Sequence, residues 1–333
     1  MILVILLIMI LTSITSLFHR YKICRLRLSS TLSSSISIDE EALKISTFIA
    51  SSHNLLIITG AGMSTSSGIP DYRSPEGSYS KGHKPIINAD FINSEYSRKR
   101  YWARSMVGYA VFSKAQPNDG HYSLARIESR NINKSLLVTQ NVDRLHQKAG
   151  SRNVIDLHGR NDKLICLSCS CKMSRTIIQK QIELLNPDIA IKVKSLINNK
   201  SNLRADGDAN LDGLIDYETF NIPNCPKCTK GILKPDVVFF GDNVKTSKVQ
   251  DIYNAADESD GLLIVGTSLE VWSAYRFVDR FAKKSNKICI INSGKTRADS
   301  SNLQISIRSE SNCTILLKKT ADLIDKFYYA NSR

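Results

Sequence analysis

Repeats and a nucleic-acid-binding pattern are both missing from this sequence of 333 residues. No segment recurs, so the pattern of a solenoid is excluded. The net charge is +14, but the basic residues are scattered and do not form a stripe interleaved with aromatic residues. Such scattering is typical of solvated surface charge and argues against nucleic acid as a partner. Hydrophobic residues at 42% and charged residues at 23% are typical of a globular protein.

Acidic residues are absent before Asp39. Residues 1–18 are almost wholly apolar, and the segment after them is basic and then serine-rich. A basic, serine-rich, acid-poor leader over residues 1–38 predicts a mitochondrial transit peptide and a location in the mitochondrial matrix. Because the apolar block begins at Met1 with no charged residue before it, an N-terminal membrane anchor or a secretory signal remains an alternative. We expect no stable membrane insertion of the mature domain.

A short apolar run at residues 55–58 is followed by Gly60, Gly62 and Ser64. This order predicts a buried parallel strand, a tight turn and a helix start. Glycines allow close approach of a pyrophosphate, and the N–H groups of a helix N-terminus favour anions. The stretch lacks the glycine spacing of a dehydrogenase and the Gly-Lys-Ser/Thr of a P-loop, so a plain strand–helix turn remains an alternative to a phosphate site. Pro70 breaks a helix here and places a polar group on a loop: Asp71, Tyr72 and Arg73.

Further apolar runs predict more buried strands, at residues 135–139, 154–157, 261–268 and 287–294, the last two including their small-residue turns. Together with helices expected at residues 38–52 and 121–129, they predict an α/β fold with a doubly wound parallel (Rossmann-like) sheet. Ligands bind such sheets at the carboxyl ends of the strands. There the sequence places Gln140, Asn141, Asp143 and His158. A histidine suits general-base catalysis, although in isolation a polar turn and a structural histidine remain alternatives.

Two Cys-x-x-Cys pairs stand out among the eight cysteines: Cys166 with Cys169, and Cys225 with Cys228. Four thiolates suit a tetrahedral zinc ion and leave it no open position, so the expected zinc is structural. The gap between the pairs, residues 170–224, is longer than in a usual zinc ribbon, and redox dithiols are the alternative. We expect the nearby Cys171 to be a bystander, with exchange of Cys171 for one of the four ligands as the alternative.

These motifs together resemble the signature of the sirtuin family. The resemblance covers roughly residues 39–320 and is fullest with class II sirtuins of the sirtuin-four type, which are mitochondrial deacylases and lipoamidases. It implies a catalytic domain over residues 39–333. Within it, a zinc module at 161–233 and a helical, cofactor-covering segment at 74–118 would form an inserted smaller zinc-binding lobe.

The resemblance also implies roles for single residues. His158 would be the general base, with Asn141 and Asp143 positioning ribose and water as further catalytic residues. Residues matching the family's NAD contacts are Gly60, Ala61, Gly62, Ser64, Asp71, Tyr72, Arg73, Gln140, Asn141, Val142, Asp143, Gly266, Thr267, Ser268, Asn292, Ser293, Gly294 and Cys313.

For the substrate, the resemblance implies a wall against which an extended peptide adds as a strand. Val238 and Phe239 belong to that wall, in a segment, residues 234–242, that we expect to return to the main sheet. Tyr101 and Arg104 match a pair that recognises acidic acyl groups in class II sirtuins, and a guanidinium suits a carboxylate.

The implied activity is NAD-dependent removal of an acyl group from a protein lysine, giving nicotinamide and O-acyl-ADP-ribose. The implied partners are acylated lysines of mitochondrial enzymes, the cofactors are NAD and one structural zinc ion, and the protein is expected to be a monomer. A protein mono-ADP-ribosyltransferase is the alternative, because the same site and cofactor would serve a different acceptor. A zinc-ribbon protein that binds nucleic acid without catalysis is the more distant alternative.

Overall fold

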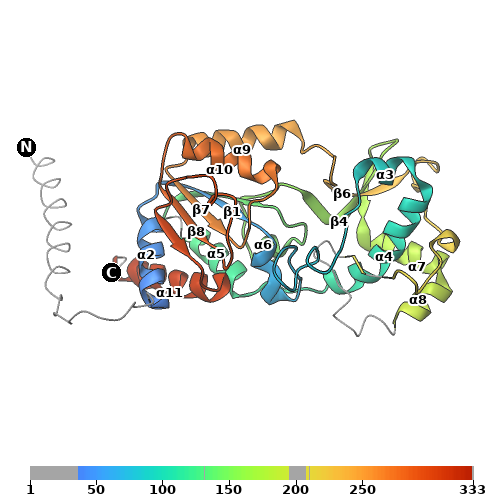
Figure 1. Cartoon of the computed structure of the whole chain (residues 1–333), viewed down its shortest axis with the longest axis horizontal. Coiled ribbons are helices and arrows are strands. Elements are labelled where there is room, and N and C mark those ends of the chain that lie inside the picture. Colours follow the sequence, from blue (N-terminus) through green and yellow to red (C-terminus); the bar gives the residue numbers. More distant parts are fainter. Residues whose placement is uncertain (1–36, 131, 195–207, 210, 332–333) are drawn as a thin grey trace, which may run out of the picture. The chain divides into compact units, whose positions relative to one another are not determined.

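A six-stranded parallel sheet forms the larger lobe (Figure 1). The computed structural model describes residues 37–130, 132–194, 208–209 and 211–331, so all but the end of the predicted leader lies outside the described residues. In spatial order the strands are β3 (Val154–Asp156), β2 (Lys134–Thr139), β1 (Asn54–Thr59), β7 (Gly261–Val265), β8 (Ile288–Ile291) and β9 (Ile307–Ser309). The chain runs outward from β1 to β3 and later returns beside β1 with β7, which makes the β1–β7 boundary the switch point where such sheets bind ligands.

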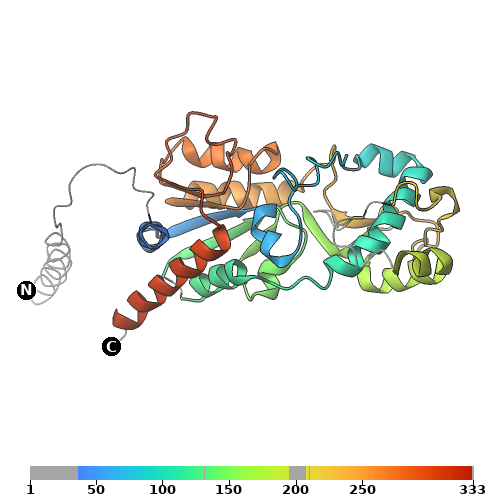
Figure 2. The same ribbon diagram turned by 60° about the horizontal axis from the view of Figure 1, so that its bottom comes forward.

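Helices cover both faces of this sheet, as the predicted doubly wound fold requires. Figure 2 shows α11 (Cys313–Asn331) on one side of the sheet and the orange α9 (Thr246–Glu258) and α10 (Trp272–Ala282) on the other. Along β1, Leu55 and Ile57 pack with α11, and Leu56 and Ile58 pack with α9 and α10. Because successive side chains of a strand point to opposite faces, a continuous apolar run is what a strand buried on both faces needs.

Two helices expected from the sequence lie on the α11 face and are confirmed within two residues. They are α2 (Ile38–Ala50) and α5 (Asp119–Ser129). A capping box begins α2, in which Ser37 and Glu40 each accept a hydrogen bond from the other's backbone N–H. Asn118 accepts the backbone N–H groups at the start of α5. No helix within the described residues is long and apolar enough to cross a membrane.

The smaller lobe is built around a three-stranded antiparallel sheet. Its strands in spatial order are β5 (Lys172–Ser174), β4 (Gly159–Cys166) and β6 (Leu233–Val237). The helices of this lobe are α3 (Asn88–Asn93), α4 (Glu95–Phe112), α7 (Arg175–Leu185) and α8 (Pro187–Lys194), with the 3₁₀ turn η4 (Tyr217–Thr219). A single apolar cluster joins them, in which Phe91, Trp102, Ile178 and Phe220 are fully buried or nearly so. Two separate insertions into the larger lobe therefore share one core.

The expectation that residues 234–242 return to the main sheet is wrong. β6 pairs antiparallel with β4, with Gly159 opposite Val237 and Cys166 opposite Leu233. An apolar run shows that a segment is buried but does not say which sheet it joins. Here β4 leaves the main sheet directly after β3, and β6 follows β4 into the smaller lobe.

Candidate active site

A cavity of about 710 Å³ opens at the carboxyl ends of β1, β2, β7 and β8. It is lined from the larger lobe by the turn after β1 and from the smaller lobe by Tyr101 and the segment after β6. The residues expected to bind NAD that line it are Ala61, Gly62, Ser64, Asp71, Tyr72, Arg73, Gln140, Asn141, Val142, Asp143, Gly266, Thr267, Ser268, Asn292, Ser293 and Gly294. Gly60 and Cys313 are not lining residues; the Cys313 thiol instead lies 3.7 Å from the carbonyl oxygen of Gly62, behind the turn.

The turn after β1 is held against the turn after β7. The backbone N–H of Gly62 donates to the carbonyl oxygen of Gly266 at 2.9 Å, and the chain then forms the 3₁₀ turn η2 (Ala61–Ser67) where the sequence predicted a helix start. Gly266 has φ +58°, and a Cβ on it would lie 2.5 Å from the backbone nitrogen of Met63. Only glycine allows this approach, which keeps side chains out of the space where β1 and β7 end.

A buried polar network joins this turn to the end of β2. Ser64 Oγ donates to Asp143 Oδ2 at 2.6 Å, and the backbone N–H of Leu145 donates to Asp143 Oδ1 at 2.9 Å. Asn141 Nδ2 donates to the carbonyl oxygen of Gly60 at 2.9 Å and contacts Ser64 Oγ at 3.0 Å. Burial raises the pKa of Asp143 although both hydrogen bonds oppose the shift. The network therefore fixes Asn141 and Asp143 at the base of the cavity.

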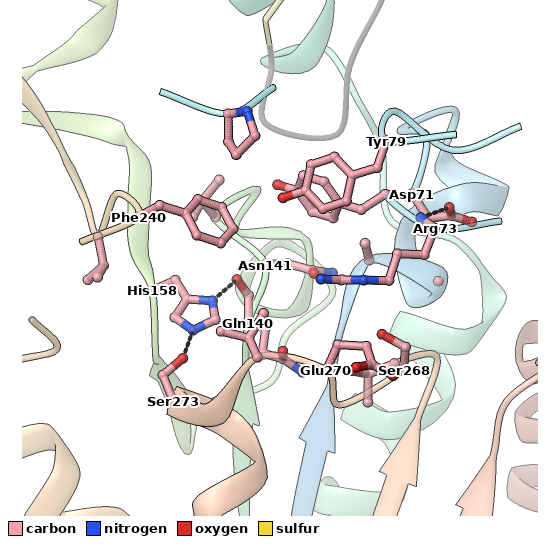
Figure 3. Close-up of a pocket in the computed structure, with 18 of the residues that line it drawn as sticks. Asp71, Arg73, Tyr79, Gln140, Asn141, His158, Phe240, Ser268, Glu270 and Ser273 are labelled. Carbon is pink, nitrogen blue, oxygen red and sulfur yellow. Dashed lines mark hydrogen bonds between the residues drawn. The ribbon is translucent and has the colours of Figure 1, made fainter. Parts of the chain in front are cut away.

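His158 follows β3 and lines the cavity with both ring nitrogens hydrogen-bonded (Figure 3). Nδ1 lies 3.2 Å from the carbonyl oxygen of Gln140, and Nε2 lies 2.8 Å from Ser273 Oγ. Because a carbonyl only accepts, Nδ1 carries the proton in the neutral ring, and Nε2 accepts from the Ser273 hydroxyl. The pKa of His158 is lowered to about 4, mainly by burial and also by the nearby charges of Lys248 and Arg276, although the hydrogen bond to Gln140 opposes the shift. The imidazole is thus neutral near pH 7, with its lone pair on Nε2.

The smaller lobe supplies the wall opposite this turn network. The backbone N–H of Val238 donates to the carbonyl oxygen of His158 at 2.9 Å, which ties the wall to the histidine. Lys234 Nζ donates to Asp242 Oδ2 at 2.9 Å and lies 4.5 Å from the centre of the Phe239 ring. Phe239 in turn packs against Tyr101, with ring centres 5.3 Å apart. Val238, Phe239 and Tyr101, which the sequence assigns to the substrate, all line the cavity.

Arg104 does not line the cavity. It lies one helical turn after Tyr101 on α4, but its side chain is buried and Nη2 pairs with Asp208 Oδ2 at 3.0 Å. Nε donates to the carbonyl oxygen of Ala209 at 3.1 Å. The helical spacing of Tyr101 and Arg104 is therefore as expected, whereas the guanidinium is already engaged by other groups of the chain.

On the loop after η2, Asp71 contacts the loop backbone, whereas Arg73 contacts an aromatic ring. Asp71 Oδ1 accepts the backbone N–H groups of Arg73 at 3.0 Å and Ser74 at 2.8 Å, so this carboxylate shapes the loop. The Arg73 guanidinium lies over the Tyr79 ring, 5.2 Å from its centre, and both side chains line the cavity (Figure 3).

The four predicted metal ligands gather in the smaller lobe. The sulfur atoms of Cys166, Cys169, Cys225 and Cys228 all lie within 4.8 Å of one another. The Cys166–Cys228 distance is 3.6 Å and the Cys169–Cys225 distance is 3.8 Å. Tetrahedral coordination with Zn–S bonds of about 2.3 Å places sulfur atoms about 3.8 Å apart, so the cluster fits zinc. Cys171 is a fifth thiol close by, with its sulfur 3.4 Å from that of Cys225.

Comparison with known proteins agrees with this geometry. The sequence profile of the Sir2 family matches residues 60–273. The chain belongs to the Sir2 family. A solved structure described as "Structural Basis for the Mechanism and Regulation of Sir2 Enzymes" superposes with a TM-score of 0.65 at 26% identity and covers 87% of this chain and 99% of that chain.

Relatives of this sirtuin come from bacteria and animals. A Bordetella bronchiseptica protein named NAD-dependent protein deacetylase is 47% identical over 252 residues, 76% of this chain and 88% of the relative. The Drosophila melanogaster protein named NAD-dependent protein deacylase Sirt4 is 44% identical over 265 residues, 79% of this chain and 81% of the relative. This sirtuin is accordingly an NAD-dependent protein deacylase whose substrates are acylated protein lysines. The similar identities do not separate a sirtuin-four type from the bacterial deacetylases.

Two residues that contact expected site residues carry no sequence signal. Ser273, in the first turn of α10, contacts the histidine 115 positions earlier in the chain. Asp208, which pairs with Arg104, belongs to the long stretch between the two cysteine pairs. Both act through contacts distant in sequence, and only folding brings those contacts together.

Proposed function

We propose that His158 is the general base of this sirtuin and that Asn141 and Asp143 position the reacting groups. The observation that carries the proposal is the neutral imidazole on the cavity wall, with Nδ1–H bonded to Gln140 and the lone pair on Nε2. A general base must be unprotonated at the working pH and within hydrogen-bond reach of the proton that it takes. A ribose hydroxyl that replaces the Ser273 hydroxyl at Nε2 would meet both conditions.

The cavity fits NAD in size and in chemistry. Its volume of about 710 Å³ lies within the range of roughly 300–1,000 Å³ typical of ligand pockets. Gly62 and Gly266, where the turns after β1 and β7 meet, have no side chains that would fill the space for a pyrophosphate. Arg73 and Lys295 add positive charge to the cavity wall. When bound, NAD supplies a ribose carbon from which nicotinamide can be displaced by the acyl-lysine oxygen. The Asn141–Ser64–Asp143 network would hold the ribose side of that reaction.

The four-cysteine cluster is proposed to hold a structural zinc ion. Four thiolates complete its coordination, so no position is left for substrate or water. The zinc would then hold together β4 and the segment before β6, and through them the substrate wall.

A finer assignment is proposed from the relatives and the leader. The Bos taurus relative named NAD-dependent protein lipoamidase sirtuin-4, mitochondrial, is 42% identical over 283 residues, 84% of this chain and 86% of the relative. Together with the class II resemblance, this supports a sirtuin-four-type deacylase that acts on mitochondrial enzymes and also removes lipoyl groups. The composition of residues 1–38 supports the mitochondrial matrix, and a fusion of these residues to a fluorescent protein tests that location by microscopy.

The test of the base assignment is turnover of an acylated peptide with NAD, followed by mass analysis of the products. We expect His158→Ala to lose roughly 10²–10⁴-fold in kcat. His53→Ala, a change at an exposed histidine, is the matched control and should retain activity. Equal turnover by His158→Ala and the unchanged protein would discard the assignment. Transfer of ADP-ribose to the protein acceptor, in place of O-acyl-ADP-ribose formation, would instead support the ADP-ribosyltransferase alternative.

A further inference from the structure

The acyl-lysine side of the cavity is lined by apolar and aromatic groups. Ile86, Tyr101 and Phe239 both line the cavity and pack in the core of the smaller lobe. The Tyr101 ring lies 5.4 Å from that of Phe91 and 5.3 Å from that of Phe239, centre to centre. Three buried cations lie behind this aromatic wall. The Arg175 guanidinium lies over the Trp102 and Tyr109 rings, and Lys234 is paired with Asp242. The third, Arg104, lies one turn after Tyr101 on α4 and has the spacing from Tyr101 that the sequence predicts for recognition of an acidic acyl group.

Arg104 is held by the stretch between the two cysteine pairs. Its side chain is 4% exposed and that of Asp208 is 10% exposed, with Arg104 Nη2 and Asp208 Oδ2 3.0 Å apart. The carbonyl oxygen of Ala209 accepts from Nε at 3.1 Å, so two adjacent residues engage two nitrogen atoms of one guanidinium. A buried pair of this kind is costly to break, because separation leaves an uncompensated charge away from water.

We propose that Asp208 sets the acyl specificity of this sirtuin: by neutralising Arg104, it gives the enzyme a preference for acyl groups with an uncharged end over those that end in a carboxylate. The inference rests on the proposed function. For Arg104 to bind an acidic acyl group, it would have to leave Asp208 buried and unpaired, or accept a second carboxylate beside the first. Both situations disfavour the acidic substrate, whereas an uncharged acyl chain needs only the apolar wall.

A second ion pair on the same two segments provides an internal control. Arg100 lies one turn before Arg104 on α4, and its Nη2 is 3.1 Å from Asp212 Oδ2, four residues after Asp208. Both of these side chains are more than two-fifths exposed, and neither lines the cavity. Breaking this outer pair perturbs the same contact between α4 and the later segment while it leaves the Arg104–Asp208 ion pair in place.

The experiment compares butyryl-lysine and succinyl-lysine peptides, which have acyl chains of equal length and differ in the terminal carboxylate. We expect the unchanged protein to have a kcat/KM at least about tenfold higher for the butyryl peptide. Asp208→Asn should lower this ratio by about tenfold, because Arg104 then lacks its carboxylate partner. Asp212→Asn should leave the ratio unchanged. The double variant Arg104→Met, Asp208→Asn should return the ratio toward that of the unchanged protein, which shows that the gain on succinyl peptide depends on the guanidinium.

Several outcomes would overturn the inference. One is an equal kcat/KM of the unchanged protein for the succinyl and butyryl peptides. This result would overturn the inference even if a melting experiment shows that Asp208→Asn does not fold. Another is a folded Asp208→Asn variant with an unaltered ratio. Calorimetric binding of the two peptides to His158→Ala gives the same comparison without turnover. Absence of NAD-dependent turnover with both peptides would count against the proposed function, while the binding ratio would still test the role of Asp208.

Discussion

The two sides of the cavity are built in different ways. On the larger-lobe side, residues 60–64 and 140–143 and His158 come directly after strands of one parallel sheet, so short local segments deliver them. On the smaller-lobe side, the wall depends on an antiparallel sheet, a cysteine cluster and α4, which are joined by contacts between distant parts of the chain. A strand end can be located from an apolar run, whereas the state of a side chain such as Arg104 depends on a partner more than a hundred residues away.

The largest expected effect is the loss of stability of the smaller lobe when the proposed zinc ion is removed. Removing the proposed zinc with a chelator, or changing Cys225→Ser, should unfold the smaller lobe and abolish acyl-peptide binding, since structural zinc sites are worth on the order of 10 kcal/mol. The larger lobe, with its own apolar core, should retain its helical circular dichroism signal. Thermal melting with and without chelator measures the effect.

Cys171→Ser is the matched control for this experiment, because Cys171 lies beside the cluster but is not one of the four expected ligands. It should bind zinc as before. Unchanged melting and activity after complete metal removal would contradict the division between a metal-stabilised lobe and a lobe stabilised by its apolar core.

Metal removal should destabilise the smaller lobe, whereas low pH should destabilise the larger lobe. The rings of His121 and His146 lie 4.7 Å apart in this lobe, and burial is the main cause that lowers the pKa of each, to about 4 for His121. The unfolded chain then binds more protons between about pH 6.5 and pH 4, so stability is full above pH 6.5 and falls as the pH decreases through that window. For His121 alone the loss is about 3 kcal/mol at pH 4.

Urea unfolding at a series of pH values measures this loss. His121→Asn should flatten the dependence by about 1.4 kcal/mol per pH unit within the window, while His53→Asn, at the exposed histidine, should leave the slope unchanged. Equal slopes for His121→Asn and the unchanged protein would show that His121 does not resist protonation in the folded lobe.

A smaller effect is expected where the two lobes join. Gly159 begins β4 directly after His158, has φ +88°, and a Cβ on it would lie 2.0 Å from the carbonyl oxygen of Asp236. Gly159→Ala should therefore lower the free energy of unfolding by at least about 1–3 kcal/mol, as urea unfolding measures.

Gly213→Ala is the matched control for this change. Gly213 has φ +78°, but among the described residues no atom outside its chain neighbours lies within 4 Å of the position that a Cβ would take. The control therefore carries the backbone strain without the clash. Similar losses in the free energy of unfolding for both variants would mean that β4 and β6 can move apart at low cost to accept the added Cβ.

Much of the larger lobe follows from local patterns in the sequence. The strands β1 and β2 appear where the apolar runs at 55–58 and 135–139 predict them, and α2 and α5 lie within two residues of their expected ranges. Polar residues that come directly after these strands line the cavity, because the carboxyl ends of parallel strands share one edge of the sheet. The assignment of residues 234–242 to the same sheet was wrong for a related reason: burial alone does not distinguish one sheet from another.

By itself, the sequence determined the family, the parallel sheet and the two cysteine pairs, because each depends on residue types at short spacing. Only the tertiary structure decided which groups those residues meet: Ser273 at Nε2 of His158, Gln140 at its Nδ1, and Asp208 at Arg104. Burial and hydrogen-bond partners set whether an ionisable side chain is neutral, charged or already paired. These conditions arise from chain segments far apart in sequence, so no local pattern encodes them.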